Sequence, residues 1–252
     1  MFQKAIVRTP GQSMVQGITT AELGIPDYDL ALEQHRSYVY ALEACGLNVT
    51  ILPADEHYPD STFVEDTAIV TRHGAIITRP GAESRKGETT SIKTILASCF
   101  DVVAEIHSGS LDGGDVMMVG DHFFVGLSDR TNAEGATALI DILNQWGMTG
   151  STVNLNTMLH LKTGIVYLER NHVLATGEFL AKPEFVPFSV LPVDEDEAYA
   201  ANSIWINDKV MTPAGYPKTR ALIEKAGYEA IEVEMSEFRK LDGGLSCLSL
   251  RF

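Results

Sequence analysis

The sequence predicts an α/β fold of five ββαβ units closed into a ring. The order strand, tight polar turn, strand, helix, strand recurs along the chain. A recurring supersecondary unit indicates stacked copies, because one unit alone cannot bury its apolar face. One strand at the C-terminus is left over to complete the unit that the N-terminus begins, which favours a ring. The apolar content of 45% suffices for the core of one domain spanning residues 1–252.

The first unit is assembled from both ends of the chain. Its N-terminal half contains "KAIVR", a helix near 27–44 and "NVTIL", and its remaining strand comes from "SCLSLRF". The second unit covers 62–106. It contains "TFVEDTAIV", a His73-Gly74 turn, "AIITR", a helix near 88–98 and "DVVAEI". Each strand is a short apolar run bounded by turn residues.

The third unit, residues 115–155, shows the pattern best. "DVMMV" and "FFVGL" flank a hairpin-like turn, and "STVNL" is the third strand. The helix between them is predicted from apolar residues at helical spacing, which are Ala136, Leu139, Ile140 and Leu143. Thr131 or Asn132 can cap its start, and Gly147 can end it.

The last two units repeat this order. In 164–193, "GIVYL" and "HVLAT" precede a short helical stretch and "FSVLPV". In 203–233, "SIWI" and "KVMTP" precede "PKTRALIEKAGY" and "EAIEV". Turns at Arg170-Asn171 and Asn207-Asp208 separate the paired strands, because these residues tolerate tight turns.

Charge and composition exclude several classes of function. A formal net charge of −15 argues against nucleic-acid binding, which requires a basic face. An acidic surface either favours cationic small molecules or only keeps the protein in solution. No apolar run approaches the roughly 20 residues of a membrane helix, and the N-terminus does not resemble a signal peptide. We therefore expect no nucleic-acid or membrane partner, and a cytoplasmic location.

The three cysteines have different sequence settings. Their scattered positions suggest neither a disulfide framework nor a structural zinc site. Cys45 and Cys99 end amphipathic helices and are expected to be small core residues. Cys247 follows a Gly-Gly pair and is expected at the start of a strand, with the exposure and rigid support that a nucleophile needs. A buried structural cysteine remains the alternative at that position.

His160 is the histidine that solvent exposure explains least. It lies between Leu159 and Leu161, immediately before a predicted strand. It is either a general acid/base whose orientation a carboxylate fixes or a core histidine with a structural partner. The rest of the chain has no HExxH, GxGxxG or GxxxxGK[ST] motif, so no metal and no cofactor is expected.

Two groups of carboxylates stand out. Asp60, Glu65 and Asp66 occur in "PDSTFVED", and a loop or bulge would be needed to bring them together, since their spacing places them on opposite faces of a strand. Asp112 and Asp115 in "LDGGD" are separated by a glycine pair that can redirect one side chain. "LDGG" occurs twice, beginning at Leu111 and at Leu241, and both copies are expected to lead onto a strand through paired glycines. In a ring, equivalent ends of successive units meet near the axis. Segments far apart in the sequence can therefore bring a cysteine, a histidine and a carboxylate together there.

Six segments together resemble one known family, the dimethylarginine dimethylaminohydrolases of the guanidino-group-modifying (pentein) superfamily. They are "DSTFVED", "ITRPGAESRKGE", "LDGGDVMMVGDHFFVGLSDRTN", "LHLKTG", "AANSIWIN" and "DGGLSCLSL". The resemblance implies a five-bladed ring of ββαβ units around a central active-site channel. It also implies the site residues by motif: Cys247 as nucleophile, His160 as general acid/base and Asp112 as the carboxylate that orients it.

The resemblance further implies a set of substrate contacts. They fall on Asp60, Glu65, Asp66, Arg85 and Arg130, on a backbone group of Leu241 and on Ile18 of a lid, where Leu is usual in the family. Without the resemblance, both arginines would be read as surface charge. A thiolate suits a planar, weakly electrophilic guanidinium, and carboxylates hold its cation by charge-assisted hydrogen bonds.

The expected function is hydrolysis of Nω-methylated arginines to citrulline and an amine. Arginine deiminases and citrulline ureidases of the same superfamily are the nearest alternatives. A non-catalytic binder of arginine or methylarginine is the alternative of a different class, and the presence of Cys247, His160 and Asp112 together argues against it. The expected partner is a small-molecule substrate, with a homodimer left open.

Overall fold

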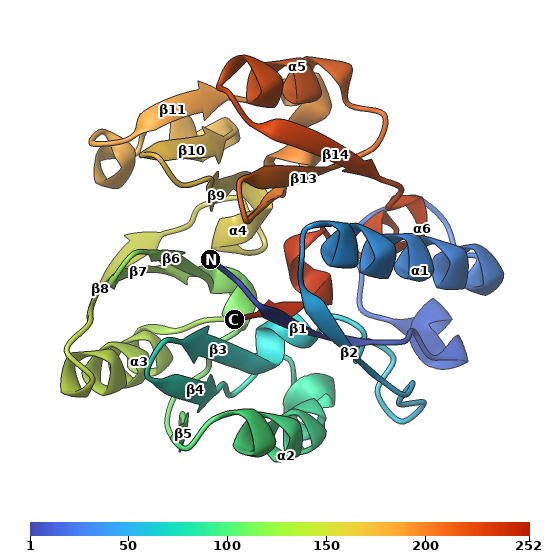
Figure 1. The fold of residues 1–252 in the computed structure, drawn as a ribbon. Helices are drawn as coiled ribbons and strands as arrows, with labels where there is room; N and C mark the ends of the chain where they lie inside the picture. The colour runs from blue at the N-terminus through green and yellow to red at the C-terminus, as the bar shows by residue number, and fades with distance from the viewer. The chain divides into compact units, whose positions relative to one another are not determined.

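Every sheet in the structure has the same three-stranded pattern. The computed structural model describes residues 1–252 and contains five such sheets (Figure 1). In each sheet the middle strand pairs antiparallel with one neighbour and parallel with the other. A parallel pair requires a crossover, and helical segments supply it. The predicted α/β class and the five ββαβ units are confirmed.

The chain forms two compact parts, which we describe separately. The central part is Glu65–Thr163, and the terminal part combines Met1–Val64 with Gly164–Phe252.

The terminal part contains three of the sheets. Their orders are β15-β1-β2, β9-β10-β11 and β12-β13-β14. The strands are β1 (Lys4–Arg8), β2 (Asn48–Leu52), β9 (Ile165–Tyr167), β10 (His172–Ala175), β11 (Ser189–Pro192), β12 (Ile204–Ile206), β13 (Lys209–Pro213), β14 (Glu229–Val233) and β15 (Leu250–Arg251). The helices are α1 (Tyr28–Ala44), α5 (Pro217–Lys225) and α6 (Ser236–Arg239), with 3-10 helices η1 (Gln12–Gln16), η5 (Gly177–Ala181), η6 (Pro183–Phe185), η7 (Glu195–Ala201) and η8 (Ser246–Leu248). As predicted, the C-terminal strand β15 joins β1.

The central part contains the other two sheets, β3-β4-β5 and β6-β7-β8. Its elements are β3 (Ala68–Thr71), β4 (Gly74–Ile77), η3 (Glu83–Glu88), α2 (Thr89–Cys99), β5 (Val103–Glu105), η4 (Gly113–Asp115), β6 (Val116–Val119), β7 (His122–Leu127), α3 (Ala133–Gln145) and β8 (Thr149–Asn154). Two short helices lie at its ends, η2 (Val64–Thr67) and α4 (Leu161–Gly164).

Helix α3 illustrates why these residues form these elements. The Asn132 side chain accepts a hydrogen bond from the Gly135 N–H at 2.9 Å, so of the two predicted caps Asn132 is the one used. Ala136, Leu139 and Leu143 are fully buried in the core of the central part. Burying each leucine contributes about 1.5–3 kcal/mol, so packing rather than helix propensity holds this helix.

Three local predictions were wrong, for one shared reason. "TFVEDTAIV" is a strand only from Ala68 onward, because Val64–Thr67 forms η2. Cys247 lies in η8 rather than at the start of a strand, and α4 separates His160 from β9. In each case one tight helical turn precedes a strand, and an alternating or apolar pattern does not distinguish such a turn from the strand that follows it.

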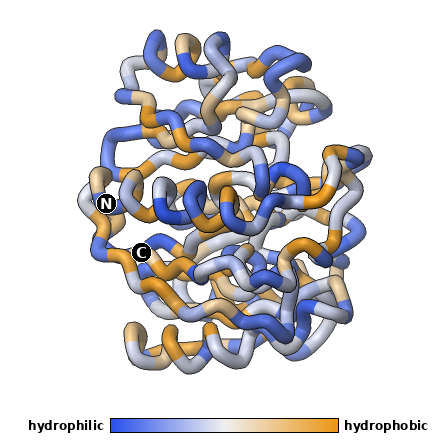
Figure 2. Tube along the Cα trace, turned by 90° about the vertical axis from the view of Figure 1, so that its right-hand side faces the viewer, coloured by the Kyte–Doolittle hydropathy of each residue, from blue (hydrophilic) through white to orange (hydrophobic).

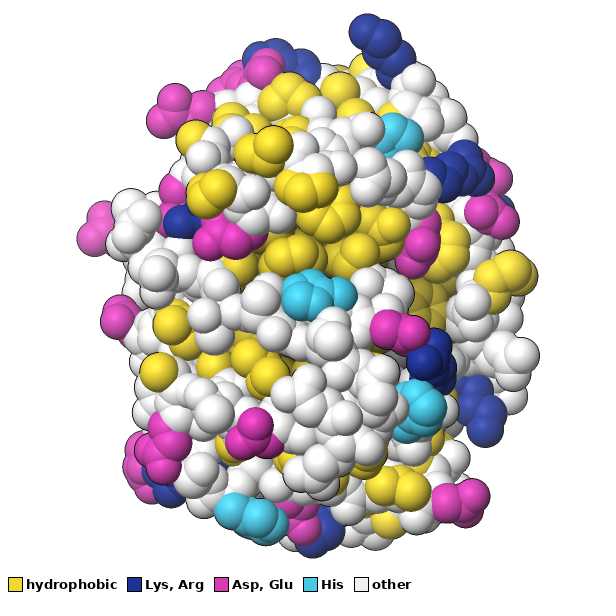
Figure 3. Space-filling view, turned by 90° about the vertical axis from the view of Figure 1, so that its left-hand side faces the viewer, with side chains coloured by type: hydrophobic (Ala, Val, Ile, Leu, Met, Phe, Trp, Pro, Cys, Tyr) yellow, Lys and Arg dark blue, Asp and Glu magenta, His cyan; other side chains and the backbone are white.

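The molecular surface agrees with the composition. On the face in Figure 3, Lys and Arg side chains are scattered with acidic ones and form no continuous basic patch. Hydrophobic and hydrophilic residues alternate over short distances along the trace (Figure 2). No helix has the length and apolar character needed to cross a membrane.

Candidate active site

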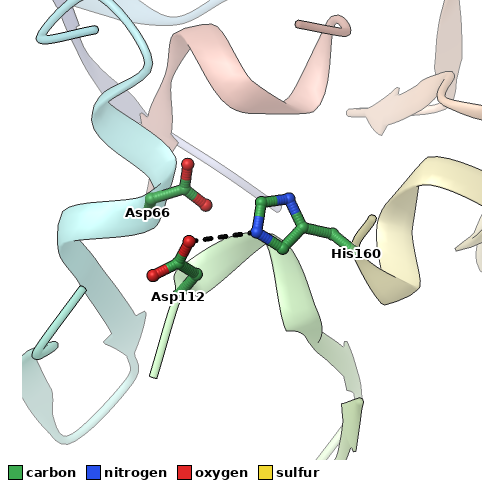
Figure 4. A group of neighbouring side chains, drawn as sticks. All are labelled: Asp66, Asp112 and His160. Atoms are coloured by element: carbon green, nitrogen blue, oxygen red, sulfur yellow. Dashed lines mark hydrogen bonds and ion pairs between the residues drawn. The ribbon is translucent and has the colours of Figure 1, made fainter. Parts of the chain in front are cut away.

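His160 and Asp112 form a hydrogen-bonded pair in the central part. Nε2 of His160 lies 3.0 Å from Oδ2 of Asp112, and Asp66 lies on the same side of the ring (Figure 4). The other oxygen of Asp112 accepts a hydrogen bond from the Gly81 N–H at 2.8 Å. Asp112 is therefore fixed at both oxygens, and it fixes the orientation of the imidazole.

The electrostatics of this pair favour a charged imidazole. Burial lowers the pKa of His160, but the carboxylates of Asp66, Asp112 and Asp115 outweigh that effect and raise it to about 9. Burial likewise raises the pKa of Asp66, yet the charges of Arg85 and His160 lower it to about 2. At neutral pH the arrangement holds an imidazolium beside ionised Asp66.

Asp66 is held by an ordered network. Its Oδ1 accepts a hydrogen bond from the Gly114 N–H at 2.8 Å, and its Oδ2 lies 2.5 Å from Nη1 of Arg85. The Arg85 guanidinium also donates to Glu88 through Nε and Nη2. These charged side chains are almost completely buried, so each depends on its partners for solvation.

The glycine pair after Asp112 is required by close packing. A Cβ at Gly113 would lie 1.9 Å from the carbonyl oxygen of Glu65. A Cβ at Gly114 would lie 2.9 Å from Cγ and Nδ1 of His160. The prediction that the paired glycines permit close backbone approach is confirmed for this copy of LDGG.

Asp115 positions the segment that carries His160, a role the sequence did not assign to it. Its Oδ1 accepts a hydrogen bond from the Leu161 N–H at 2.9 Å, and its Oδ2 accepts one from the Ser128 hydroxyl at 2.6 Å. The side chain is fully buried, which raises its pKa. The signal available in the sequence was the second acidic residue of "LDGGD", directly after the glycine pair.

Glu65 pairs with a lysine that the sequence did not single out. Nζ of Lys162 lies 2.6 Å from Oε1 of Glu65, and both side chains are largely buried. Lys162 belongs to "LHLKTG", two residues after His160. Arg130 differs from Arg85, because it is half-buried and forms no salt bridge with a carboxylate.

Asp66, Asp112 and His160 are the cluster that could hold a metal ion, since their ligand atoms lie within 4.8 Å of one another. His160 opposes this, because its Nε2 already bonds Asp112 and its imidazolium would have to lose a proton to become a ligand. The donor set therefore fits a proton-carrying imidazole better than a metal.

Cys247 lies in the terminal part, on the turn formed by the second LDGG and η8. Its thiol is half-buried, and the Gly244 N–H points at Sγ from 3.3 Å. The Cys247 N–H in turn donates to the carbonyl oxygen of Gly244 at 3.2 Å. A hydrogen-bond donor directed at sulfur stabilises the thiolate, which is the nucleophilic form.

Asp60, Ile18 and Leu241 also gather in the terminal part. Oδ1 of Asp60 accepts a hydrogen bond from the Ile18 N–H at 3.0 Å. A Cβ at Gly17 would lie 2.9 Å from Asp60 Oδ1 and 3.3 Å from Leu241 Cδ1. Asp60 and Leu241 are buried, whereas Ile18 is 37% exposed.

The loop that carries Ile18 is held mainly by carboxylates. Glu56 accepts the amides of Gln12 and Ser13, each at 2.8 Å. Asp242 accepts the amide and the hydroxyl of Thr20 at 2.5 and 2.9 Å. The second LDGG thus uses its aspartate to anchor this loop, unlike the first copy.

Comparison with known proteins decides the family. A family model described as arginine deiminase matches residues 56–204. An N(G),N(G)-dimethylarginine dimethylaminohydrolase from Pseudomonas aeruginosa is 54% identical, over 100% of both chains. The chain belongs to the dimethylarginine dimethylaminohydrolase family. A second member, from Streptomyces coelicolor, is 38% identical over 99% of this chain and 96% of its own.

Solved structures of the family superimpose closely on this chain. The Pseudomonas aeruginosa enzyme, a cysteine-to-serine variant complexed with citrulline, matches with a TM-score of 0.99 at 54% identity over 100% of both chains. A histidine-to-glycine variant of a dimethylarginine dimethylaminohydrolase, an adduct with S-methyl-L-thiocitrulline, matches equally well. The N-terminal domain of a cyanobacterial arginine dihydrolase shares the fold, with a TM-score of 0.88 at 18% identity and coverage of 98% and 97%. The predicted pentein fold class is confirmed.

Proposed function

We propose that this protein hydrolyses Nω,Nω-dimethyl-L-arginine to L-citrulline and dimethylamine, and Nω-monomethyl-L-arginine to L-citrulline and methylamine. It acts without a cofactor, as one catalytic domain over residues 1–252, in the cytoplasm. Membership of the dimethylarginine dimethylaminohydrolase family supports the reaction. The observation that carries the chemistry is His160, held protonated by buried carboxylates and oriented by Asp112.

In the first half-reaction, the thiolate of Cys247 attacks the central carbon of the guanidinium and forms a C–S bond. The imidazolium of His160 gives its proton to the dimethylated nitrogen, so that dimethylamine leaves as a neutral amine and the C–N bond breaks. Because Asp112 holds Nε2, the transferred proton is the one on Nδ1. The glycine at 114 keeps that edge of the ring from being covered.

In the second half-reaction, neutral His160 takes a proton from water, and the hydroxide adds to the carbon of the S-alkylthiouronium intermediate. Collapse of this adduct breaks the C–S bond and returns the thiolate of Cys247, while the hydroxyl proton of the adduct passes to solvent and citrulline is released. The Gly244 N–H, 3.3 Å from Sγ, stabilises the thiolate both as nucleophile and as leaving group.

The substrate's cationic head is bound by acidic residues, Asp60, Glu65 and Asp66, with backbone contacts from Ile18 and Leu241. Arg85 and Arg130 hold the α-carboxylate. Arg85 already pairs with Asp66 and Glu88, whereas Arg130 has no carboxylate partner. We therefore expect Arg130→Ala to raise KM with little change in kcat, and Arg85→Ala to damage the acidic network as well.

A substrate panel tests the proposal. Dimethylarginine, monomethylarginine, arginine and citrulline are supplied separately, and citrulline, dimethylamine, methylamine, ammonia and ornithine are measured. We expect the highest kcat/KM for a methylated arginine. Citrulline should be a weak inhibitor at most, since losing one charge-assisted hydrogen bond costs about 1.5–3 kcal/mol. Ammonia from arginine or from citrulline as the preferred reaction would make the protein a deiminase or a ureidase and contradict the proposal.

Two cysteine variants test the nucleophile. Cys247→Ala should abolish turnover and the mass adduct that substrate leaves on the Cys247 peptide. Cys99→Ala is the matched control, because Cys99 is also partly exposed but ends helix α2. It should keep full activity. An active Cys247→Ala enzyme would show that another group attacks the guanidinium.

A further inference from the structure

The turn that carries Cys247 is tied to its surroundings at several points. Tyr199 donates from its hydroxyl to the carbonyl oxygen of Gly243 at 2.8 Å. Tyr38 donates to the carbonyl oxygen of Leu245 at 2.9 Å. These tyrosines come from η7 and α1, far from the turn in the sequence, so long-range contacts hold the turn's backbone in addition to its own hydrogen bonds.

Asn202 contacts the turn on both sides of Leu245, at Gly244 and at Ser246. This residue directly follows η7 and is 6% exposed. Its Oδ1 accepts the Ser246 N–H at 2.9 Å, and its Nδ2 donates to the Ser246 hydroxyl at 3.2 Å. Its amide also lies flat against Gly244, where an added Cβ would be 2.5 Å from Asn202 Cγ and 2.7 Å from both Oδ1 and Nδ2. One amide therefore holds the residue before the cysteine and the residue whose N–H points at Sγ.

We propose that Asn202 is a positioning residue for the nucleophile, which holds Gly244 and Ser246 so that the Gly244 N–H is directed at Sγ of Cys247. This inference rests on the proposed role of Cys247. It adds a residue to which the mechanism above assigns no step. It also explains two sequence features together. Position 244 must be glycine because the Asn202 amide occupies the space of a side chain, and "AANSIWIN" carries the partner of "DGGLSC".

The physical effect expected is on the ionisation of the thiol. A donor aimed at sulfur favours the thiolate over the thiol, so misdirecting the Gly244 N–H leaves less thiolate at neutral pH. Tyr199 is the titratable group of η7 that interacts with Cys247, and burial raises the pKa of its phenol. Its proton is engaged with Gly243, so it remains neutral while Cys247 titrates.

The test measures the alkylation rate of Cys247 by iodoacetamide against pH, with the Cys247 peptide quantified by mass spectrometry. In Asn202→Ala we expect the midpoint of the curve of alkylation rate against pH to rise by about one pH unit. Alkylation at neutral pH should slow by up to about tenfold. The kcat should fall by a similar factor, with KM within about twofold. Tyr38→Phe is the control. It removes a tether from the same turn without touching Gly244, so it should lower stability and leave the midpoint unchanged.

A double-mutant cycle isolates the Asn202–Gly244 contact. Gly244→Ala should disturb alkylation strongly in the native background and less in the Asn202→Ala background, where the clash is gone. An unchanged midpoint in Asn202→Ala would overturn the inference even if kcat fell. If that variant does not fold, an unchanged midpoint in Gly244→Ala, whose added Cβ would displace the Asn202 amide, would do so. Alkylation does not require turnover, so a failure of the proposed function, with Cys247→Ala active, is distinguishable from a failure of this inference.

Discussion

Two largely enclosed histidines in this protein have opposite acid–base behaviour. His35, on α1 in the terminal part, is 3% exposed, and burial lowers its pKa to about 4 despite a hydrogen bond with the Arg8 backbone. The side chain of His160, in the central part, is 12% exposed, and its pKa is raised to about 9. The rings are the same, so the difference lies in their neighbours.

The difference shows what burial does alone and what carboxylates add to it. Nε2 of His35 is buried with no hydrogen-bond partner, so a second proton there would have nothing to solvate it. Nε2 of His160 faces Asp112, with Asp66 and Asp115 nearby, so the imidazolium is the favoured form. The first ring is held neutral and inert, and the second is held charged and ready to donate.

The largest expected difference between substituting His160 and substituting His35 is in kcat. His160→Ala should lower kcat by about 10⁴-fold, the upper end of the range for general acid/base residues. His35→Gln should keep kcat within about twofold, because that ring packs in the core and performs no chemistry. Steady-state kinetics with dimethylarginine measure both. A His160→Ala enzyme of near-native kcat between pH 6 and 9 would show that another residue moves the protons.

Asp112→Asn should produce the next largest effect. An amide can still hold Nε2 but cannot stabilise the imidazolium, so kcat should fall on the order of 10²–10³-fold. The pKa of His160 should also fall, because one of its carboxylates is neutralised. The alkaline limb of the pH–kcat profile should therefore move to lower pH. Asp66→Asn should move it too while leaving the Asp112 hydrogen bond intact, and an unmoved limb in both variants would contradict the role of His160 as acid.

The fold was predictable from sequence because its signal is repeated. Five copies of strand–turn–strand–helix–strand make each single assignment less critical, and α3 follows its apolar spacing and its cap. Short helical turns such as η2 and η8 escaped prediction. A turn of three or four residues is stabilised by contacts with residues far along the chain. Asn202 makes such a contact with η8 through Ser246, and no local sequence pattern indicates it.

The two LDGG copies also show that a local sequence pattern does not indicate contacts with distant residues. The need for glycine was predictable, since both pairs lie against other chain segments. The roles of Asp112 and Asp242 were not predictable from the tetrapeptide. Asp112 holds an imidazole, while Asp242 adopts a φ of +57° and anchors Thr20. The resemblance to a family, rather than the tetrapeptide, distinguished them. The role of Asp115, and the importance of Lys162 and Asn202, became visible only through contacts in three dimensions.

The buried His35 should make stability depend on pH in the acid range. Its folded pKa is depressed to about 4 from 6.5, so its contribution is fully present above pH 6.5 and is lost as the pH falls toward 4. The full shift corresponds to about 3 kcal/mol in the free energy of unfolding. Urea unfolding at several pH values should show a flatter acid slope for His35→Gln than for the native chain, and equal slopes would contradict a neutral buried ring. His160 acts in the opposite sense, and its contribution is lost as the pH rises through about 9.

The smallest expected effect concerns a third histidine. It tests whether burial alone determines the size of the pKa shift of each histidine. His122 is half-buried, and its two ring nitrogens lie 2.8 Å from the hydroxyls of Thr149 and Ser151. A hydroxyl can donate or accept, so these contacts do not select the charged ring as a carboxylate would, and burial lowers the pKa of His122. NMR titration of the ring protons should therefore place its midpoint below 6.5 but above that of His35, with His160 highest. Thr149→Val should shift the His122 midpoint further down, since one polar neighbour is lost. A His122 midpoint above 6.5 would mean that hydroxyl contacts stabilise the imidazolium, and that the contrast between His35 and His160 depends less on carboxylates than on any polar partner.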